Sequence, residues 1–256
     1  MIKFFRKIRY DLMEKNKTTK YFKYAIGEII LVVIGILIAL QINNWNEIRK
    51  QRDKELHYLV NIKKDLNLNI KELDKYIAVR AKAIASANTI IEHYEGKPIT
   101  DLKTFSQHTV DIYTWRKFFQ INNTFQELTN SGNLTLISND SIKGILLNME
   151  TLYKVMKYEE EHFRYDAEQL LYEPSFNMMD MNDIVQNYTY KVTSGAMGED
   201  RELSTEEFGN MLNDKKQKNG FVMAAYEFGA MNRQSIEMKA MCNQLIELID
   251  KEIEME

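Results

Sequence analysis

The stretch "KYAIGEIILVVIGILIALQINNW", residues 23–45, decides how this chain folds. From Ala25 to Ile42 it has 18 residues, of which only Glu28 and Gln41 are strongly polar. A helix of that length spans roughly 27 Å, close to the hydrocarbon thickness of a bilayer. Residues 29–40 are all Ile, Leu, Val, Gly or Ala, so the helix is apolar on every face, unlike a core helix of a water-soluble domain. The composition predicts a transmembrane helix.

A cleaved signal peptide is the main alternative to a transmembrane helix here. Against it, 23 residues precede the apolar run, and no convincing A-x-A-like cleavage site follows it. Aromatic side chains, which favour the membrane–water interface, flank the run on both sides. We therefore predict an uncleaved transmembrane helix over residues 24–45. The expected interface residues are Tyr21, Phe22, Tyr24 and Trp45.

Charge predicts which side of the membrane each part of the chain occupies. Residues 1–45 contain 8 basic and 3 acidic residues, and the other 211 residues contain 26 basic and 34 acidic residues. The net charges are therefore +5 and −8. Because Lys and Arg near a span favour the cytoplasmic side, we expect a basic cytoplasmic tail over residues 1–23. The acidic body, residues 46–256, is expected outside the cytoplasm.

The tail permits two interpretations. Its sequence "MIKFFRKIRYDLM" places Ile2, Phe5, Ile8 and Leu12 on one helical face, with the basic residues mostly opposite. An amphipathic helix of this kind can lie on an anionic leaflet. The alternative is an unstructured basic tail that only sets the topology.

Glu28 is the ionisable residue inside the apolar run. An ionisable group within a span is by default a functional hypothesis, because placing it in hydrocarbon costs free energy. One alternative is structural: Glu28 reaches the cytoplasmic interface or pairs with Lys20 or Lys23. The other is a carboxylate that handles a proton or cation in an oligomer, as in stator-like subunits.

The composition of the chain predicts a mainly helical protein without a disulfide framework. It has 10 Gly, 2 Pro and 1 Cys, so helix breakers are scarce and an internal disulfide is excluded. Cys242 falls on an apolar helical stripe and is expected in the core. The acidic body argues against nucleic acid as a partner.

Motifs of known chemistry are scarce in this sequence. It contains no P-loop, G-x-S-x-G or H-E-x-x-H motif. Glu159-x-x-His162 matches half of a di-iron site in a helical bundle, which needs a second such pair. We interpret this pair as part of a solvated charged face. No catalytic residue, cofactor or metal site is therefore predicted, and we expect a protein that is not an enzyme.

Two seven-residue apolar registers follow the predicted span. Their steps alternate three and four, which is typical of a heptad seam, and Lys63 and Arg80 interrupt them. Because no Gly or Pro occurs between Gly35 and Gly96, we expect one helix to continue to about His93. The candidate self-association seam consists of Leu56, Leu59, Leu66, Ile70, Leu73, Ile77, Ile84 and Ile91. Alternatively, the two charged residues mark where this helix packs against its own chain.

Capping and turn signals divide the remaining chain into further helices. Gly96 and Pro98 end the long helix, Thr124 opens a capping box, Gly132 closes the helix that follows, and Ser204 opens a second box. The expected longer helices cover residues 101–120, 141–172 and 219–254, and residues 173–203 are expected to be irregular. We predict an all-α protein. Its N-terminal transmembrane helix continues into a long helix, and an antiparallel helical bundle follows outside the membrane.

Two strings carry a resemblance to a known family. "KYFKYAIGEIILVVIGILIALQINNWNE" resembles the opening of an uncharacterised family of single-span membrane proteins in Bacteroidota. "NTFQELTNSGNLTLISN" is similar to the internal helix–turn signature of that family. The resemblance covers most of the chain and implies a Gram-negative inner membrane and a periplasmic body. It implies no activity and no site residues.

Three functions fit these features. The first is a membrane-anchored interaction protein, either a self-associating scaffold or an accessory subunit of an envelope complex. The second is an extracytoplasmic sensor without its own output module, in which residues 173–203 cover a ligand pocket. The third is an ion-coupled, stator-like subunit that uses Glu28.

Overall fold

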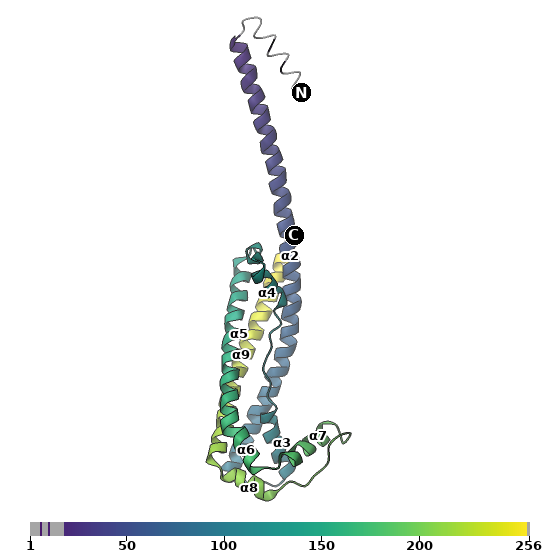
Figure 1. Cartoon of the computed structure of the whole chain (residues 1–256), viewed down its shortest axis with the longest axis vertical. Helices are drawn as coiled ribbons and strands as arrows, with labels where there is room; N and C mark the ends of the chain where they lie inside the picture. Colours follow the sequence, from purple (N-terminus) through teal and green to yellow (C-terminus); the bar gives the residue numbers. More distant parts are fainter. Residues whose placement is uncertain (1–5, 7–9, 11–17, 255–256) are drawn as a thin grey trace. The chain divides into compact units, whose positions relative to one another are not determined.

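A computed structural model describes Arg6, Tyr10 and residues 18–254 (Figure 1). All regular structure in this described part is helical, which confirms the predicted all-α fold. The chain divides into two compact units, Met1–His57 and Tyr58–Glu256, and each unit is described by itself.

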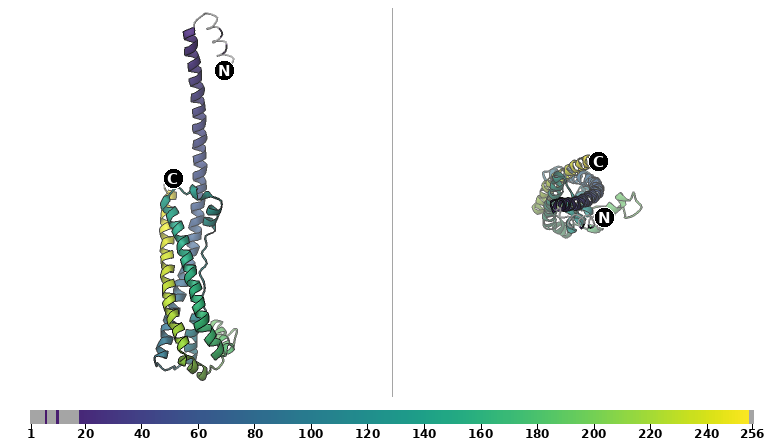
Figure 2. Two further views of the ribbon diagram at one scale, coloured as in Figure 1. Left: turned by 60° about the vertical axis from the view of Figure 1, so that its left-hand side comes forward. Right: turned by 90° about the horizontal axis from the view of Figure 1, so that it is seen from above.

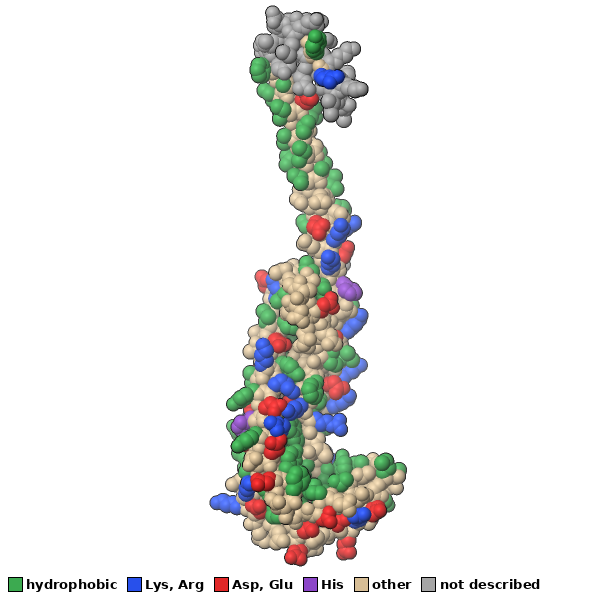
Figure 3. Space-filling model, in the orientation of Figure 1, with side chains coloured by type: hydrophobic (Ala, Val, Ile, Leu, Met, Phe, Trp, Pro, Cys, Tyr) green, Lys and Arg blue, Asp and Glu red, His purple; other side chains and the backbone are tan. Residues whose placement is uncertain are grey.

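Helix α2 (Thr18–Tyr94) begins in the first unit and ends in the second, close to the predicted end at about His93. In the first unit, the large apolar side chains from Ile26 to Ile42 are each between 46% and 62% exposed, and many are visible in Figure 3. This stretch is long and apolar enough to cross a membrane. The amphipathic face predicted for the tail (Ile2, Phe5, Ile8 and Leu12) lies outside the described residues.

Three long helices form the second unit: residues 58–94 of α2, α5 (Asp140–Ala167) and α9 (Lys215–Glu254) (Figures 1 and 2). Four side-chain pairs fix their directions, namely Lys63 with Asp250, Arg80 with Ser235, Asn139 with Glu252, and His162 with Glu227. Residue numbers fall along α9 as they rise along α2 and α5. Helix α9 is therefore antiparallel to both of the others.

The helix predicted over residues 101–120 is shorter in the structure. Helix α3 (Leu102–Tyr113) ends because Thr114 donates both its N–H and its hydroxyl to the Val110 carbonyl oxygen. The chain then runs over residues 115–122 without regular secondary structure. The prediction was wrong for this segment, because its backbone polar groups bond to neighbouring helices instead of to one another.

The capping box predicted at Thr124 is also wrong. Helix α4 (Asn123–Asn130) begins without a side-chain cap, and Thr124 donates its N–H and its hydroxyl to Asp65 of α2 at 3.0 and 2.8 Å. The predicted closure at Gly132 is confirmed, since this residue has a left-handed φ of 72°. The 3₁₀-helix η1 (Asn133–Leu136) follows. The N–H and hydroxyl of Thr124 thus bind Asp65, which is distant in sequence, instead of forming the expected local cap.

The structure corrects the irregular segment predicted over residues 173–203. It contains helix α6 (Glu173–Met178) and helix α7 (Met181–Val192). The buried Ser175 fixes α6 to the bundle, because its hydroxyl lies 2.6 Å from the Tyr113 hydroxyl. The apolar periodicity of residues 173–203 is weak because α6 and α7 are short. Helices this short depend on tertiary contacts.

Residues 193–203 are the longest part of that segment without regular structure. Gly195 and Gly198 adopt positive φ angles of 82° and 78° there, which favour glycine. Helix α8 (Thr205–Asn213) follows, and the Ser204 hydroxyl accepts a hydrogen bond from the Glu207 N–H. The second predicted capping position is thereby confirmed.

The core of the second unit consists of two apolar clusters. One contains Leu59, Leu66 and Leu73 of α2 together with residues of α5 and α9 such as Met156 and Met238. The other is aromatic, with Phe105, Phe163, Phe208, Phe221 and Phe228 among its members. In each long helix one buried polar residue lies between the two clusters, namely Arg80 in α2, Glu160 in α5 and Ser235 in α9.

A close approach near the end of α5 predicts unequal effects of two Gly→Ala substitutions in α9. A Cβ at Gly220 would lie 2.7 Å from the Leu171 Cδ2 atom of the π-helix η2 (Glu168–Tyr172), and 2.9 Å from the Leu170 carbonyl oxygen. Gly220→Ala should therefore lower the free energy of unfolding by at least about 1 kcal/mol through overpacking.

Gly229 in the same helix is the matched control. A Cβ at this position would lie 3.8 Å from a guanidinium nitrogen of Arg233, so alanine fits there without a clash. Gly229→Ala should stabilise the chain by about 0.5–1 kcal/mol, because alanine favours helix. Urea unfolding followed by circular dichroism measures both changes, and equal stabilisation by the two variants would contradict the close packing at Gly220.

Candidate functional site

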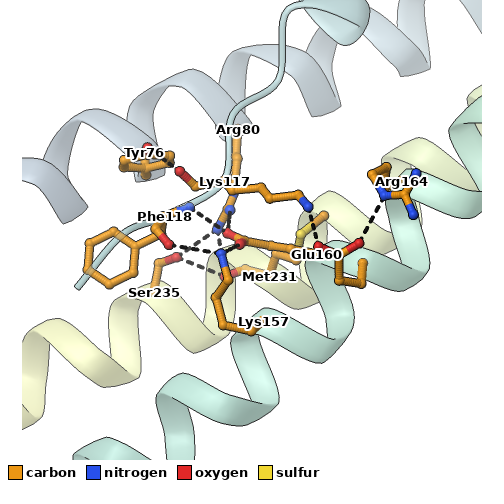
Figure 4. A network of polar contacts seen from close by, with 10 residues as sticks. Tyr76, Arg80, Lys117, Phe118, Lys157, Glu160, Arg164, Met231 and Ser235 are labelled. Carbon is orange, nitrogen blue, oxygen red and sulfur yellow. Dashed lines mark hydrogen bonds and ion pairs between the residues drawn. The ribbon is translucent and has the colours of Figure 1, made fainter.

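A buried ion pair lies between the two apolar clusters (Figure 4). Arg80 of α2 donates from Nη2 to Oε1 of Glu160 in α5 at 2.7 Å, and the two residues are only 3% and 1% exposed. Arg80 also donates from Nη1 to the Ser235 hydroxyl of α9 at 2.9 Å. One polar layer thus joins all three long helices.

The same carboxylate binds residues 115–122, here called the extended segment. Glu160 Oε1 accepts a hydrogen bond from the Phe118 N–H at 2.8 Å, and Oε2 accepts one from Lys157 at 3.0 Å (Figure 4). Lys157 also donates to the Phe118 carbonyl oxygen at 3.3 Å. Both backbone polar groups of Phe118 therefore find side-chain partners, as buried backbone groups require.

Two further residues of α2 bind the extended segment. Asn69 exchanges two hydrogen bonds with the backbone of Ile121, each 2.7 Å long. Tyr76 donates its hydroxyl to the Lys117 carbonyl oxygen. With Asp65, these residues form a polar face on α2 that binds backbone groups between Lys117 and Thr124.

The electrostatics of this layer favour a structural role. Burial lowers the pKa of Arg80, whereas the charge of Glu160 raises it. Burial and the Glu160 charge together raise the pKa of Tyr76, whose ring centroid lies 5.5 Å from Arg80 Cζ. Arg80 and Glu160 each have several partners within the chain. The polar layer therefore stabilises the fold of the protein itself.

A second titratable cluster lies on the surface between α5 and α9. It consists of His162, which is exposed, Asp166, which is half-buried, and Glu227, which is 6% exposed. One ligand atom from each lies within 4.8 Å of the others. Burial first, and then the negative charge of Asp166, raises the pKa of Glu227 to about 7.

The open clefts on the second unit include two of similar volume. One, of about 450 Å³, lies beside Arg80 and is also lined by Tyr76, Trp115 and Tyr188. The other, of about 460 Å³, lies between α3 and α7 and is lined by Gln107, Val110, Ile184, Tyr188, Lys191 and Leu203. The segment expected to cover a ligand pocket thus lines one cleft with residues of α7 and of the loop that follows it.

The structure divides the candidate seam into two sets. Leu59, Leu66 and Leu73 are buried against α5 and α9 of the same chain. The other candidates are half-buried, namely Leu56, Ile70, Ile77, Ile84 and Ile91. Arg80 bonds within its own chain, as the intramolecular alternative predicts, and Lys63 pairs with Asp250. Self-association stays a prediction, and the leucine register already has a place in the core.

The residues predicted for the membrane lie in α2. Phe22 and Trp45 are exposed, and Arg49 Cζ lies 5.4 Å from the Trp45 ring centroid. The side chains of Tyr21 and Tyr24 lie outside the described residues. Glu28 is half-buried and has an interaction partner, and both hypotheses for it stay predictions.

From the sequence, residues of the polar layer and of the titratable cluster could be identified only one at a time, not as groups. Arg80 stood out as a charge in an apolar register, but nothing identified Glu160 as its partner. His162 was noted with Glu159, whereas the structure brings it to Glu227. Cys242 is buried as predicted, and burial raises the pKa of its thiol to about 12, which makes it a poor nucleophile.

Comparison with known proteins identifies a family that this chain matches. A family of unknown function (DUF6090) matches residues 28–205, which include part of the apolar stretch and most of the second unit. No curated protein and no solved structure matches the chain.

Proposed function

The chain belongs to the family of unknown function DUF6090, and we propose that it is a membrane-anchored, non-enzymatic interaction protein. In this proposal residues 24–45 span the inner membrane of a Gram-negative bacterium of the Bacteroidota. Residues 1–23 lie in the cytoplasm, and residues 46–256 form a periplasmic helical bundle. The protein acts as a self-associating scaffold or as an accessory subunit of an envelope complex.

One observation carries the anchor. Every large apolar side chain from Ile26 to Ile42 is about half exposed, on all faces of α2. In water so large an apolar surface is unfavourable. In a bilayer the lipid covers it, and the helix satisfies its own backbone hydrogen bonds. The exposed Trp45 with Arg49 beside its ring supports an interface position at one end.

Two observations support an interaction role. The buried charges of Arg80 and Glu160 bind groups within the bundle. Recognition of a partner would therefore depend on surface residues. Helix α7 and the loop after it stand away from the three long helices (Figures 1 and 2). They expose apolar side chains, with Val185 52%, Val192 58% and Met197 64% exposed, and an exposed apolar surface is suited to a protein partner.

A pair of substitutions tests the anchor. Ile34→Lys with Leu37→Lys should move the protein from the membrane pellet to the soluble fraction, because Lys near the centre of a span strongly opposes insertion. Ile236→Lys is the matched control: this side chain is 53% exposed in α9, and the variant should stay in the membrane. An unchanged distribution of the double variant between the two fractions would contradict the anchor.

The mass of the detergent-extracted full chain tests self-association in the same preparation. Light scattering, with the detergent contribution subtracted, should give a defined oligomer. A monomer that co-purifies with no envelope protein in stoichiometric amount would overturn the interaction role. It would not affect the anchor, because fractionation measures that independently.

The cleft between α3 and α7 favours a second candidate, an extracytoplasmic sensor. Its volume of about 460 Å³ lies within the range of small-molecule sites. Its lining combines the apolar Val110 and Ile184 with polar groups on Gln107 and Asn187. Saturable binding of a defined metabolite that Gln107→Ala abolishes would favour this function over the scaffold.

A further inference from the structure

Glu227 is a carboxylate that the fold buries without a donor. The residue lies in α9 and is 6% exposed. Within the described part of the chain, neither of its carboxylate oxygens has a hydrogen-bond partner. The ring nitrogen Nδ1 of His162 lies 3.6 Å from Oε1, beyond hydrogen-bond distance. An ionised carboxylate buried in this way is unfavourable unless a positive charge lies beside it, so a cation bound here would stabilise the charged form of Glu227.

The neighbouring side chains supply the rest of a coordination set. His162 and Asp166 are four residues apart in α5, so their side chains project from the same face of the helix. Glu227 faces them from α9, and one ligand atom from each of the three residues lies within 4.8 Å of the others. Ligand atoms about 2.0–2.1 Å from a tetrahedral zinc ion are about 3.3 Å apart, so side-chain movements totalling about 1.5 Å would close the set.

We propose that His162, Asp166 and Glu227 form a site for one divalent transition-metal ion that links α5 to α9. Two carboxylates balance the charge of a divalent ion, and an imidazole nitrogen favours zinc-like ions over Mg²⁺ or Ca²⁺. His162 is exposed, so the ion faces solvent on that side, and water completes its coordination. The ion supplies the positive charge that pairs with the buried Glu227 carboxylate.

The direct test is zinc binding by the full chain in detergent. The protein carries no polyhistidine tag and is stripped of metal with EDTA, and isothermal titration calorimetry with Zn²⁺ measures the affinity. We expect one ion per chain. Glu227→Gln and His162→Gln should each weaken binding at least about tenfold, since even residues that only orient a ligand contribute that much. Co²⁺ in place of Zn²⁺ should give a visible absorption band that both variants lose.

Two matched controls isolate the site. Glu237→Gln removes an exposed carboxylate from the same helix as Glu227, and His57→Gln removes an exposed histidine from α2. Both should bind Zn²⁺ like the parent chain. Asp166→Asn serves as a third site variant if either of the first two melts non-cooperatively by circular dichroism. Zn²⁺ binding that survives unchanged in the folded site variants, or the absence of saturable binding by the parent, would overturn the proposal.

Discussion

Glu160→Ala should lower the free energy of unfolding by about 3–5 kcal/mol, the loss typical of removing one member of a buried ion pair. The substitution leaves the Arg80 guanidinium, which is 3% exposed, without its carboxylate. It also leaves the Phe118 N–H of the extended segment without an acceptor. Urea unfolding of the full chain in detergent, followed by circular dichroism, measures the loss.

The neighbouring Glu161 provides a matched control for this prediction. Its carboxylate pairs with Lys117 and Arg164 at the surface, where solvent screens the charges. Glu161→Ala should therefore be much less destabilising than Glu160→Ala. Equal losses for the two variants would show that the buried layer contributes no more than a surface ion pair.

A double variant separates the ion pair from the hydrogen bond to Phe118. Arg80→Met combined with Glu160→Leu removes both charges, so no unpaired charge stays buried. We expect the double variant to lose less stability than the sum of the two single variants, because the two sites are directly coupled. The remaining loss then measures the extended segment, whose Phe118 N–H still lacks its acceptor.

Glu227→Gln should stabilise the metal-stripped chain by about 3 kcal/mol at about pH 8 and change its stability little at about pH 5. In the folded chain, burial and then the nearby Asp166 raise the pKa of Glu227 from 4.5 to about 7, with Glu159 adding to the effect and His162 opposing it. At pH values between 4.5 and about 7, Glu227 is protonated in the folded chain and ionised in the unfolded chain. Stability therefore falls as the pH rises through this window, and the loss is complete above the folded pKa.

Urea unfolding at both pH values in EDTA measures this difference. Glutamine resembles the protonated carboxyl group in shape and cannot ionise, so the variant should lack this pH dependence. Glu237→Gln, on an exposed position of α9, should leave the pH dependence of the parent unchanged. A Glu227→Gln effect of the same size at both pH values would mean that ionisation of Glu227 does not oppose folding.

The sequence alone was sufficient where the cause of a structure is local. The apolar run over residues 29–40 predicts an exposed apolar helix, because composition alone makes every face of it apolar. Gly96, with a φ of 106°, and the cap at Ser204 mark helix ends, because each acts on the backbone of residues next to it. The register of Leu59, Leu66 and Leu73 identifies a buried face of α2.

Only the tertiary structure decided features whose partners are distant in sequence. Residues 115–122 have no helical structure because Asn69, Tyr76 and Glu160 satisfy their backbone groups, and no local pattern encodes those bonds. The same holds for Glu227, because its neighbour His162 comes from another helix. Helical periodicity specifies which face of a helix is apolar, whereas the packing of several helices determines which polar residues meet.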